Sequence, residues 1–295
     1  MLYLFPLLTV SIWAGNAIVN KLSYSVIDPG AISFYRWLFA MLVLTPFVAK
    51  SVWRHRKTIQ PHLSKLAFLA LLGMVLNQSL GYFAAVTTTA TNIALIVSLV
   101  PLISMFLSVP LLGQRLSPLA IVGAVLSLGG LVLMLSHGDV HMLAAQGITQ
   151  GDGLLLIAAF VYALYCVLLR RWQMPLTNWQ SVYVQGVFAV MMLTPMLLSS
   201  ERIAITSEAL PLIMYAAIPA SVIAPWCWLQ GIQRLGADRT AMFMNLMPVM
   251  TAAIASVTLN EQLASYHYAG GLMVLSGVAL AQMKIKARQQ NLATA

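Results

Sequence analysis

Ten stretches of about twenty apolar residues follow one another along the chain and constrain its fold more than any other feature. A helix of about twenty residues can cross the ~30 Å hydrocarbon core of a bilayer. The stretches lie at residues 2–22, 31–50, 65–86, 91–111, 118–136, 153–171, 179–198, 210–231, 239–259 and 267–284. A composition of 60% apolar and 8% charged residues excludes a soluble globular or a disordered chain. We therefore predict an all-α integral membrane protein with ten transmembrane helices.

The basic residues indicate how these helices are oriented. With the N-terminus in the cytoplasm, 13 of the 16 Lys and Arg residues fall on the cytoplasmic side. They are Lys50, Arg54, Arg56, Lys57, Lys65, Arg115, Arg170, Arg171, Arg234, Arg239, Lys284, Lys286 and Arg288. Cytoplasmic loops carry such an excess, so we predict cytoplasmic termini and a multi-pass location in the cell inner (plasma) membrane. Because the net charge of +9 is spread along the whole chain, no nucleic-acid partner is expected.

The sequence also contains an internal repeat of about half its length. A shift of 149 residues places Leu44-Thr45-Pro46 on Leu193-Thr194-Pro195, and a shift of 147 places Pro101 on Pro248. Each half holds five predicted spans, an odd number, so the second half enters the membrane in the opposite orientation. Inverted repeats are typical of secondary transporters, whose substrate site lies near the midplane. The expected units are a first five-helix repeat at 1–140, a second, inverted repeat at 150–286 and a cytoplasmic tail at 287–295.

Several short segments carry a resemblance to a known family. They are 34–40 (FYRWLFA), 99–102 (LVPL), 112–116 (LGQRL), 231–241 (GIQRLGADRTA), 246–249 (LMPV) and 259–263 (LNEQL). Together they are similar to the EamA-type members of the drug/metabolite transporter (DMT) superfamily, and the similarity covers essentially the whole chain. The resemblance implies a ten-helix transporter. The chain departs from the family pattern at Gln114, where the family has glutamate, so that of this acidic pair only Glu261 is present.

The repeat and the resemblance together predict a transporter rather than an enzyme. The expected mechanism is alternating access around a central cavity, with helix breaks at Pro101 and Pro248 as hinges or gates. The expected cargo is a small metabolite such as an amino acid, and the resemblance favours export. The alternatives are export of amphiphilic drugs or dyes, carriage of a sugar-like metabolite, and a signalling or scaffold role without transport. An intramembrane enzyme is disfavoured because no span groups Asp, Glu or His residues.

Arg36 is an ionisable residue inside a predicted span, where a charge is costly in hydrocarbon. It is suited to bind a carboxylate or phosphate of the solute. The alternative is that it snorkels to the outer interface or satisfies backbone carbonyls. No Asp or Glu is expected deep in any span, since Asp152 and Glu261 fall in predicted outer links. The proton exchange through a membrane-embedded glutamate that the small multidrug-resistance relatives perform is therefore disfavoured.

Neutral polar and aromatic residues on several spans predict a central pocket. Trp13, Asn16 and Asn20 recur at helical spacing on the first span and so share a face. The candidates that join them and Arg36 are Gln78 and Tyr82, Ser98, Tyr162 and Tyr165, Trp226 and Gln230, and Asn245. Such a pocket suits a zwitterionic or neutral solute with an apolar part. The alternative is that the amides and hydroxyls hydrogen-bond neighbouring helices.

Four tryptophans lie near predicted span ends, as in the interfacial belts of membrane proteins. They are Trp37, Trp53, Trp172 and Trp179. Both cysteines, Cys166 and Cys227, lie in apolar stretches and are expected as small core residues. We therefore expect neither a disulfide, a metal site nor a cofactor.

Small residues mark one face of the fifth and the tenth predicted span. The glycines concerned are Gly123, Gly130, Gly270 and Gly277. Small faces let helix backbones approach closely. We expect these two helices to pack against each other within a monomer, and homodimerisation through them is the alternative.

Overall fold

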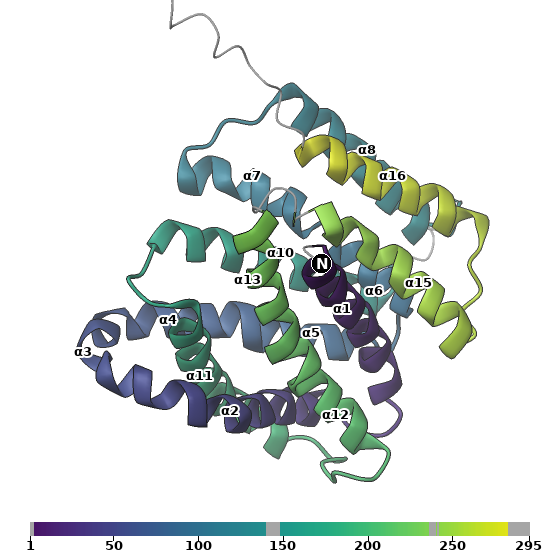
Figure 1. Ribbon diagram of the computed structural model, residues 1–295. Helices are drawn as coiled ribbons and strands as arrows, with labels where there is room; N and C mark the ends of the chain where they lie inside the picture. Colours follow the sequence, from purple (N-terminus) through teal and green to yellow (C-terminus); the bar gives the residue numbers. More distant parts are fainter. Residues whose placement is uncertain (1–2, 140–147, 236–239, 241, 283–295) are drawn as a thin grey trace, which may run out of the picture.

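A computed structural model describes residues 3–139, 148–235, 240 and 242–282, and this part of the chain is helical without β-strands (Figure 1). Its first half contains α1 (Leu4–Ser23), α2 (Pro29–Arg54), α3 (Arg56–Ile59), η1 (Gln60–His62), α4 (Leu63–Ala70), η2 (Leu71–Leu76), α5 (Asn77–Ala84), α6 (Ala90–Val97), α7 (Val100–Leu112) and α8 (Pro118–Leu135). Its second half contains α10 (Gln150–Trp172), α11 (Asn178–Leu198), α12 (Ala209–Ala217), η3 (Pro219–Ile223), α13 (Ala224–Leu235), η4 (Met242–Leu246), α15 (Met247–Thr258) and α16 (Ser265–Gln282). The predicted tail at 287–295 lies outside the described residues.

Seven helical stretches in the described ranges are long and apolar enough to cross a membrane. They are Pro29–Arg54, Arg56–Ala84, Ala90–Leu112, Pro118–Leu135, Gln150–Trp172, Asn178–Leu198 and Ala209–Leu235. A shorter apolar helix covers Phe243–Thr258. The helices α1 and α16, with 20 and 18 residues, cover the first and last predicted spans. The prediction of an all-α membrane protein is thus supported, while the count of ten spans stays a prediction.

Hydroxyl side chains determine where several helices begin. Thr89, Ser117, Thr149 and Thr177 each accept a hydrogen bond from the backbone N–H three residues further on. At the other end of α7, Gly113 adopts a left-handed conformation with φ 66°, which glycine tolerates because it has no Cβ. These caps keep the links short, so that consecutive helices run antiparallel.

The long helices are interrupted at four places. The π-helical segments η2 and η3 interrupt the third and the eighth predicted spans. Pro101 and Pro248 are each the second residue of a helix, α7 and α15, that follows a break in the fourth and the ninth predicted spans. Proline has no N–H to continue a helix, which explains the breaks where the sequence led us to expect them. A gating role for the two prolines stays a prediction.

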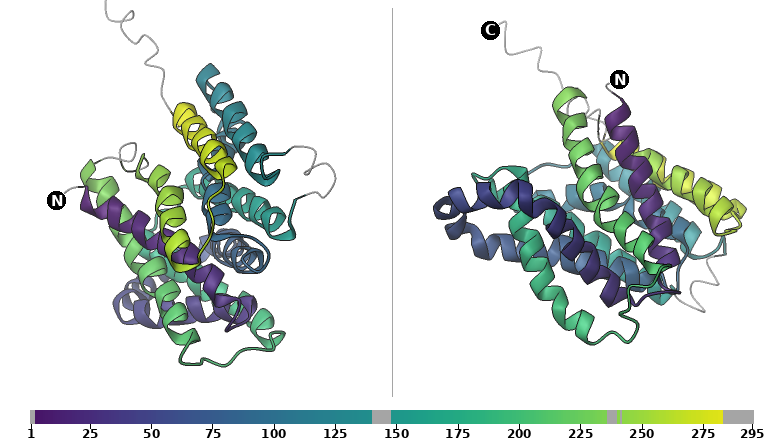
Figure 2. Two further views of the ribbon diagram at one scale, coloured as in Figure 1. Left: turned by 90° about the vertical axis from the view of Figure 1, so that its right-hand side faces the viewer. Right: turned by 60° about the horizontal axis from the view of Figure 1, so that its bottom comes forward.

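The helices α8 and α16 run side by side as a closely packed pair (Figure 2). A Cβ added to Gly130 would lie 2.5 Å from the carbonyl oxygen of Gly270. Ser127 adds a hydrogen bond of 3.1 Å to the carbonyl of Val274 on α16. The small-residue faces of the two helices therefore meet within one chain.

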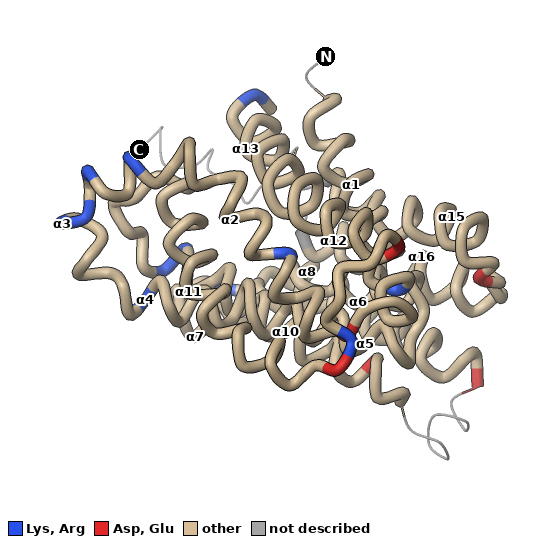
Figure 3. Tube along the Cα trace, turned by 90° about the horizontal axis from the view of Figure 1, so that it is seen from below, with Lys and Arg blue, Asp and Glu red and all other residues tan. Residues whose placement is uncertain are grey.

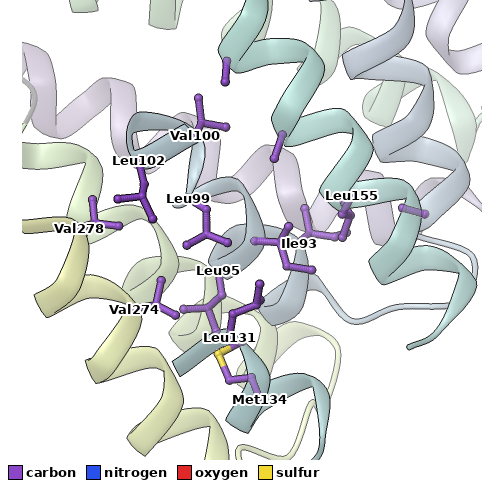
Figure 4. Close-up of a cluster of buried hydrophobic side chains, with 14 of the residues drawn as sticks. Ile93, Leu95, Leu99, Val100, Leu102, Leu131, Met134, Leu155, Val274 and Val278 are labelled. Atoms are coloured by element: carbon purple, nitrogen blue, oxygen red, sulfur yellow. The ribbon is translucent and has the colours of Figure 1, made fainter. Parts of the chain in front are cut away.

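An apolar core joins this pair to the rest of the molecule. Leu95 of α6 and Leu99 of the α6–α7 break lie on the side of the cluster nearer to Val274 and Val278 of α16, and Leu155 of α10 lies beside Ile93 on its other side (Figure 4). All six side chains are at most 4% exposed, so a continuous apolar cluster connects the two halves of the chain.

Charged residues divide between the two ends of the helices. Figure 3 shows Lys and Arg around α3, α4 and the end of α13, whereas Asp and Glu lie toward α5, α15 and α16. This division is the one that the sequence pattern of basic residues led us to expect. The assignment of the basic end to the cytoplasm stays a prediction.

Candidate functional site

A cavity of about 610 Å³ lies between the helices of the two halves. The elements that line it are α1, α2, η2, α5, α6, α10, α11, η3, α13, η4 and α15. Its volume falls in the range of small-molecule pockets, and its lining combines aromatic rings, amides and one charged side chain.

One face of α1 forms part of the cavity wall. Trp13, Asn16 and Asn20 all line the cavity, in agreement with their helical spacing. The indole of Trp13 donates a hydrogen bond of 3.2 Å to the carbonyl of Ala220 in η3. A π-helical turn leaves such carbonyls without their usual α-helical partner, which explains why η3 can accept this bond.

Arg36 lies on α2 and is 4% exposed, so it neither snorkels to an interface nor binds backbone carbonyls. Its Nε donates to the hydroxyl of Ser221 in η3 at 2.7 Å. Its Nη1 donates to Oε1 of Gln78 at 2.8 Å and to the hydroxyl of Tyr82 at 3.3 Å. All three partners are neutral, and none of the ion pairs in the described ranges includes Arg36.

Two aromatic pairs form further parts of the lining. Trp13 packs against Trp228 of α13 with ring centroids 5.6 Å apart. Tyr162 and Tyr165 of α10 stack with centroids 5.5 Å apart. Both pairs leave ring faces available to an apolar solute, because all four residues line the cavity.

Two amide oxygens in the lining have no hydrogen-bond partner among the described residues. They are Oδ1 of Asn16 and Oε1 of Gln185, both inaccessible to solvent. Gln185 is 1% exposed, and its amide nitrogen donates to Ser181 at 2.8 Å. A buried acceptor without a donor is unfavourable, and a side-chain rotation that turned either oxygen into the cavity would let it accept a hydrogen bond from a solute.

Two predicted pocket residues lie just outside the cavity. Tyr82 is 1% exposed and does not line the cavity, but its hydroxyl supports Arg36. Ser98 donates its hydroxyl to the carbonyl of Leu95 at 2.6 Å, within the same stretch of helix. The break before α7 leaves the carbonyl of Leu95 without a helical partner. It therefore accepts the hydroxyl of Ser98, which we expected to line the pocket.

Trp226 points away from the cavity, contrary to our expectation. It is 43% exposed, and its ring meets that of Phe5 edge-on with centroids 6.0 Å apart. Residues two positions apart point about 200° apart around a helix. Because Trp228 faces the cavity and packs against Trp13, Trp226 faces outward.

Gln230 and Asn245 do not line the cavity either. Gln230 accepts a hydrogen bond from Arg234, one turn further along α13, at 3.2 Å. Asn245 lies in η4, a 3₁₀ turn with three residues per turn. Met244 and Met247 are three residues apart, so this period places both of them, and not Asn245, on the side that faces the cavity.

Two tryptophans that we expected in interfacial belts line the cavity. Trp37 is 5% exposed and donates its indole N–H to the carbonyl of Met74 in η2 at 3.1 Å. Trp179 lines the cavity at the start of α11. Proximity to a span end does not tell which face of the helix a tryptophan occupies, so the belt interpretation was wrong for these two.

Gln185 and Ser221 line the cavity but were not among the predicted residues. The repeat contained a signal for the first of them, because the shift of 149 residues places Arg36 on Gln185. The two residues occupy corresponding positions of α2 and α11. No sequence pattern predicted Ser221. Its hydroxyl lies beside Arg36 because Ser221 is part of the π-helical turn η3, which the sequence did not predict.

The two ends of the cavity differ. At one end its lining includes two exposed residues, Gln173 in the α10–α11 link (residues 173–177) and Asn178 directly after it. We call this the open end. At the opposite end its lining includes Asn20, Ile93 and Leu155, which are at most 7% exposed. We call this the closed end, together with the adjacent α5–α6 link (residues 85–89).

Charged side chains bind the α5–α6 link at the closed end. Lys21 donates to the carbonyl of Ala85 at 2.8 Å. Glu261 accepts from the backbone N–H groups of Ala90 and Thr91 at 2.7 and 3.2 Å, and so caps α6 from the α15–α16 link. A carboxylate at a helix N-terminus is favoured by the helix dipole.

Asp152 lies within α10, is 2% exposed and also belongs to the closed end. The sequence interpretation, which placed it in an outer link, missed its burial. Its carboxylate accepts from the side chains of Thr88 and Thr149 at 2.5 and 2.6 Å and from that of Asn92 at 3.3 Å. Three donors around one carboxylate compensate for the burial of its charge.

Asp28 joins the α1–α2 and α11–α12 links at the same side of the molecule. Its carboxylate forms an ion pair of 2.9 Å with Nε of Arg202. Burial acts to raise the pKa of Asp28, but hydrogen bonds from the backbone N–H groups of Arg202 and Glu201 and from the Arg202 side chain outweigh it. The pKa of this carboxyl therefore lies below its ordinary value.

The described ranges contain no group of three or more His, Cys, Asp or Glu side chains that could hold a metal ion. Cys166 and Cys227 are both free thiols. The described lining of the cavity offers hydrogen-bonding groups, aromatic rings and the charge of Arg36.

The model of the EamA-like transporter family matches residues 1–136 and again residues 149–283. The chain belongs to the EamA-like transporter family. An uncharacterized transporter of Archaeoglobus fulgidus is 28% identical, over 96% of this chain and 97% of the relative. The uncharacterized transporter YyaM of Bacillus subtilis is 25% identical, over 97% of this chain and 95% of its own length. The chain is thus a multi-pass membrane transporter of the EamA type.

A solved crystal structure supports the fold of this family member. It superposes with a TM-score of 0.61 over 95% of each chain, at 18% sequence identity. At this identity the similarity concerns the arrangement of helices and not the cargo. Both relatives are named as transporters.

Proposed function

We propose that the chain moves small metabolites across the inner (plasma) membrane, with amino acids and related zwitterionic or neutral solutes as its cargo and export as the favoured direction. The observation that carries this proposal is the cavity of about 610 Å³ between the two halves. The described residues of its lining offer aromatic faces, amides and one guanidinium, and none of them is a carboxylate. Such a lining matches a solute with polar groups on an apolar body.

The different ends of the cavity support alternating access. In this mechanism the open end faces the cytoplasm, where the basic residues gather, and the closed end faces outward. The two halves then act as inverted five-helix repeats that rock around the cavity. The breaks before Pro101 and Pro248 and the π-helical segments, which begin at Leu71 and Pro219, occur at matching places in the two halves and provide flexible points.

The chain works as a monomer in this proposal. The glycine faces of α8 and α16 are occupied by each other, so they are not available to a second copy. No proton exchange through a buried carboxylate is included, because no Asp or Glu lines the cavity in the described ranges. No cofactor is required.

Flux of labelled amino acids in liposomes containing the purified protein tests the proposal. Trp228→Ala removes a ring from the cavity wall, so we expect it to lower the flux several-fold. Trp226→Ala removes the same ring two residues away on the outer face of α13, so we expect normal flux. Equal effects of the two substitutions would contradict the assignment of the cavity.

The same preparation separates the competing functions. Flux of amphiphilic dyes or of a sugar in place of amino acids would select those cargo classes. Absence of flux for all of these solutes would favour a signalling or scaffold role. Loading the labelled solute inside or outside the liposomes measures the preferred direction.

A further inference from the structure

Arg36 differs from the other charged side chains that the structure buries. Asp152, which is also nearly inaccessible, accepts hydrogen bonds from three side chains. Arg36 contacts only neutral groups, and the positive charge has no carboxylate beside it in the described ranges. A buried charge without a counter-ion is strongly unfavourable, and within a membrane such a residue has a functional reason.

The guanidinium is held in place but not saturated. Ser221 accepts from Nε, and Gln78 and Tyr82 accept from Nη1. The Nη2 group makes no hydrogen bond to any described residue, although arginine can donate two bonds from this atom. Because Arg36 lines the cavity, these donors are available to a bound solute.

We propose that Arg36 binds a carboxylate of the transported solute, an inference that rests on the proposed transport function. The solute class is a monocarboxylate on an apolar body. Ser221, Gln78 and Tyr82 act as positioning residues, since they orient the guanidinium without neutralising it. A charge-assisted hydrogen bond from Nη2 then forms when the solute enters.

The charge of the lining favours a carboxylate over a phosphate. Arg36 is the one charged side chain among the described residues that line the cavity. A single negative charge neutralises it, whereas a phosphate dianion would leave an excess negative charge in a low-dielectric space. The rings of Trp13 and Trp228, at 5.6 Å, provide apolar surface for the rest of the solute.

The unsatisfied amide oxygens extend the inference to a second group of the solute. Asn16 Oδ1 and Gln185 Oε1 are hydrogen-bond acceptors without donors in the lining. Gln185 occupies the position in the second half that Arg36 occupies in the first. When rotation of the two amides turns these oxygens into the cavity, an ammonium group of the solute satisfies them, so we expect a zwitterion to bind more tightly than the corresponding acid without nitrogen.

The test measures the affinity of the full-length protein in detergent for small solutes. Quenching of tryptophan fluorescence reports binding, since four tryptophans line the cavity. The probes are phenylalanine, leucine and methionine, each compared with the amine that lacks the carboxylate and the acid that lacks the ammonium. We expect each amino acid to bind most tightly, the acid less tightly and the amine at least about tenfold more weakly than the amino acid. Amines that bind as tightly as the amino acids would overturn the proposal.

Variants assign the effect to Arg36. Arg36→Gln introduces the residue found at the matching position of the second half, and it should abolish the preference for the amino acid over the amine. Gln185→Leu should weaken the binding of the amino acid and leave the affinity for the acid unchanged. Trp226→Ala, outside the cavity, should alter neither. Thermal unfolding identifies a variant that fails to fold, and in that case the probe series on the unaltered protein still decides.

The outcomes also separate this inference from the transport function. If no probe with a carboxylate binds but dyes or sugars cross liposome membranes, Arg36 is not a carboxylate site and the transport function stands. If the carboxylates bind but nothing is transported, the site stands and the transport function fails.

Discussion

The closed and the open end of the cavity are stabilised in different ways. At the closed end, Lys21, Asp152 and Glu261 hold the α5–α6 link through hydrogen bonds from three different parts of the chain. At the open end, the lining residues Gln173 and Asn178 are exposed, and their side chains make no hydrogen bond to another described residue. In the proposed alternating-access cycle, opening the closed end therefore requires breaking charge-assisted bonds, whereas Gln173 and Asn178 have no such side-chain bonds to described residues.

This comparison also shows two uses of buried charge in one molecule. The acids of the closed end are saturated by hydrogen bonds, so they stabilise one arrangement of the helices. Arg36, in the cavity wall, has donors left over, and we propose that they bind a solute. Substitutions of the charged residues at the closed end should therefore change stability, and substitutions of the exposed lining residues Gln173 and Asn178 at the open end should not.

The largest effect is expected for Asp152→Ala. It leaves the buried donors of Thr88 and Asn92 without an acceptor, so we expect a loss of about 3 kcal/mol in the free energy of unfolding. Thermal or denaturant unfolding in detergent measures the loss. The control is Glu208→Ala, an exposed acid on the same side of the molecule, which should change stability by less than about 0.5 kcal/mol. Equal stabilities of the two variants would contradict the structural role of Asp152.

A smaller effect is expected for Glu261→Gln. The amide keeps the size of the side chain but removes the charge that caps α6, so we expect a loss of about 1 kcal/mol. The same unfolding measurement applies, with the exposed neighbour substitution Gln262→Ala as a control. If Glu261→Gln behaves like this control, the cap does not contribute to the closed end.

The ion pair of Asp28 with Arg202 should contribute below about 1 kcal/mol, because Arg202 is exposed. The pKa of Asp28 in the folded protein is lowered from its ordinary value of 3.8. A lowered pKa stabilises the folded state above pH 4, and that contribution disappears as the pH falls through the folded-state pKa. The difference in Tm between the unaltered protein and Asp28→Asn should therefore be constant near neutral pH and vanish in acid. A difference that grows in acid would refute the assignment.

The smallest effect is expected at the open end. Asn178→Ala removes an exposed side chain that lines the cavity mouth, so stability should change by less than about 0.5 kcal/mol. The N-cap of α11 provides the contrast, because Thr177→Ala removes a side chain that accepts from the backbone N–H of Gln180 and should cost about 1 kcal/mol. If Asn178→Ala lowers the free energy of unfolding as much as Thr177→Ala does, the Asn178 side chain stabilises the open end, contrary to this prediction.

Much of the helical arrangement followed from local patterns. Apolar length predicted where the long helices lie, although not the short α3 and η1 between the second and third predicted spans, and the prolines at 101 and 248 predicted where two of the long helices break. Helical spacing correctly placed Trp13, Asn16 and Asn20 on one cavity-lining face. These features depend on neighbours within a few turns of one helix, which a single sequence contains.

The rotation of each helix about its own axis was harder to predict. Trp226 and Trp228 lie in equally apolar surroundings along the chain, yet only Trp228 faces the cavity, because it meets Trp13 there. Trp37 likewise turned inward to bond the carbonyl of Met74. In a membrane both sides of a helix are apolar, so hydrophobicity does not distinguish the side that faces lipid from the side that faces protein.

From its residues alone, this chain can be recognised as an all-helical membrane protein of the EamA type with an internal repeat and a basic residue within a span. Those conclusions need only apolar length, charge bias and motif spacing. The environment of Arg36, the burial of Asp152 and the unsatisfied oxygen of Gln185 needed the packed molecule. Hydrogen bonds across 42 to 185 residues of sequence create the environments of Arg36 and Asp152, and no local pattern encodes which helices will meet.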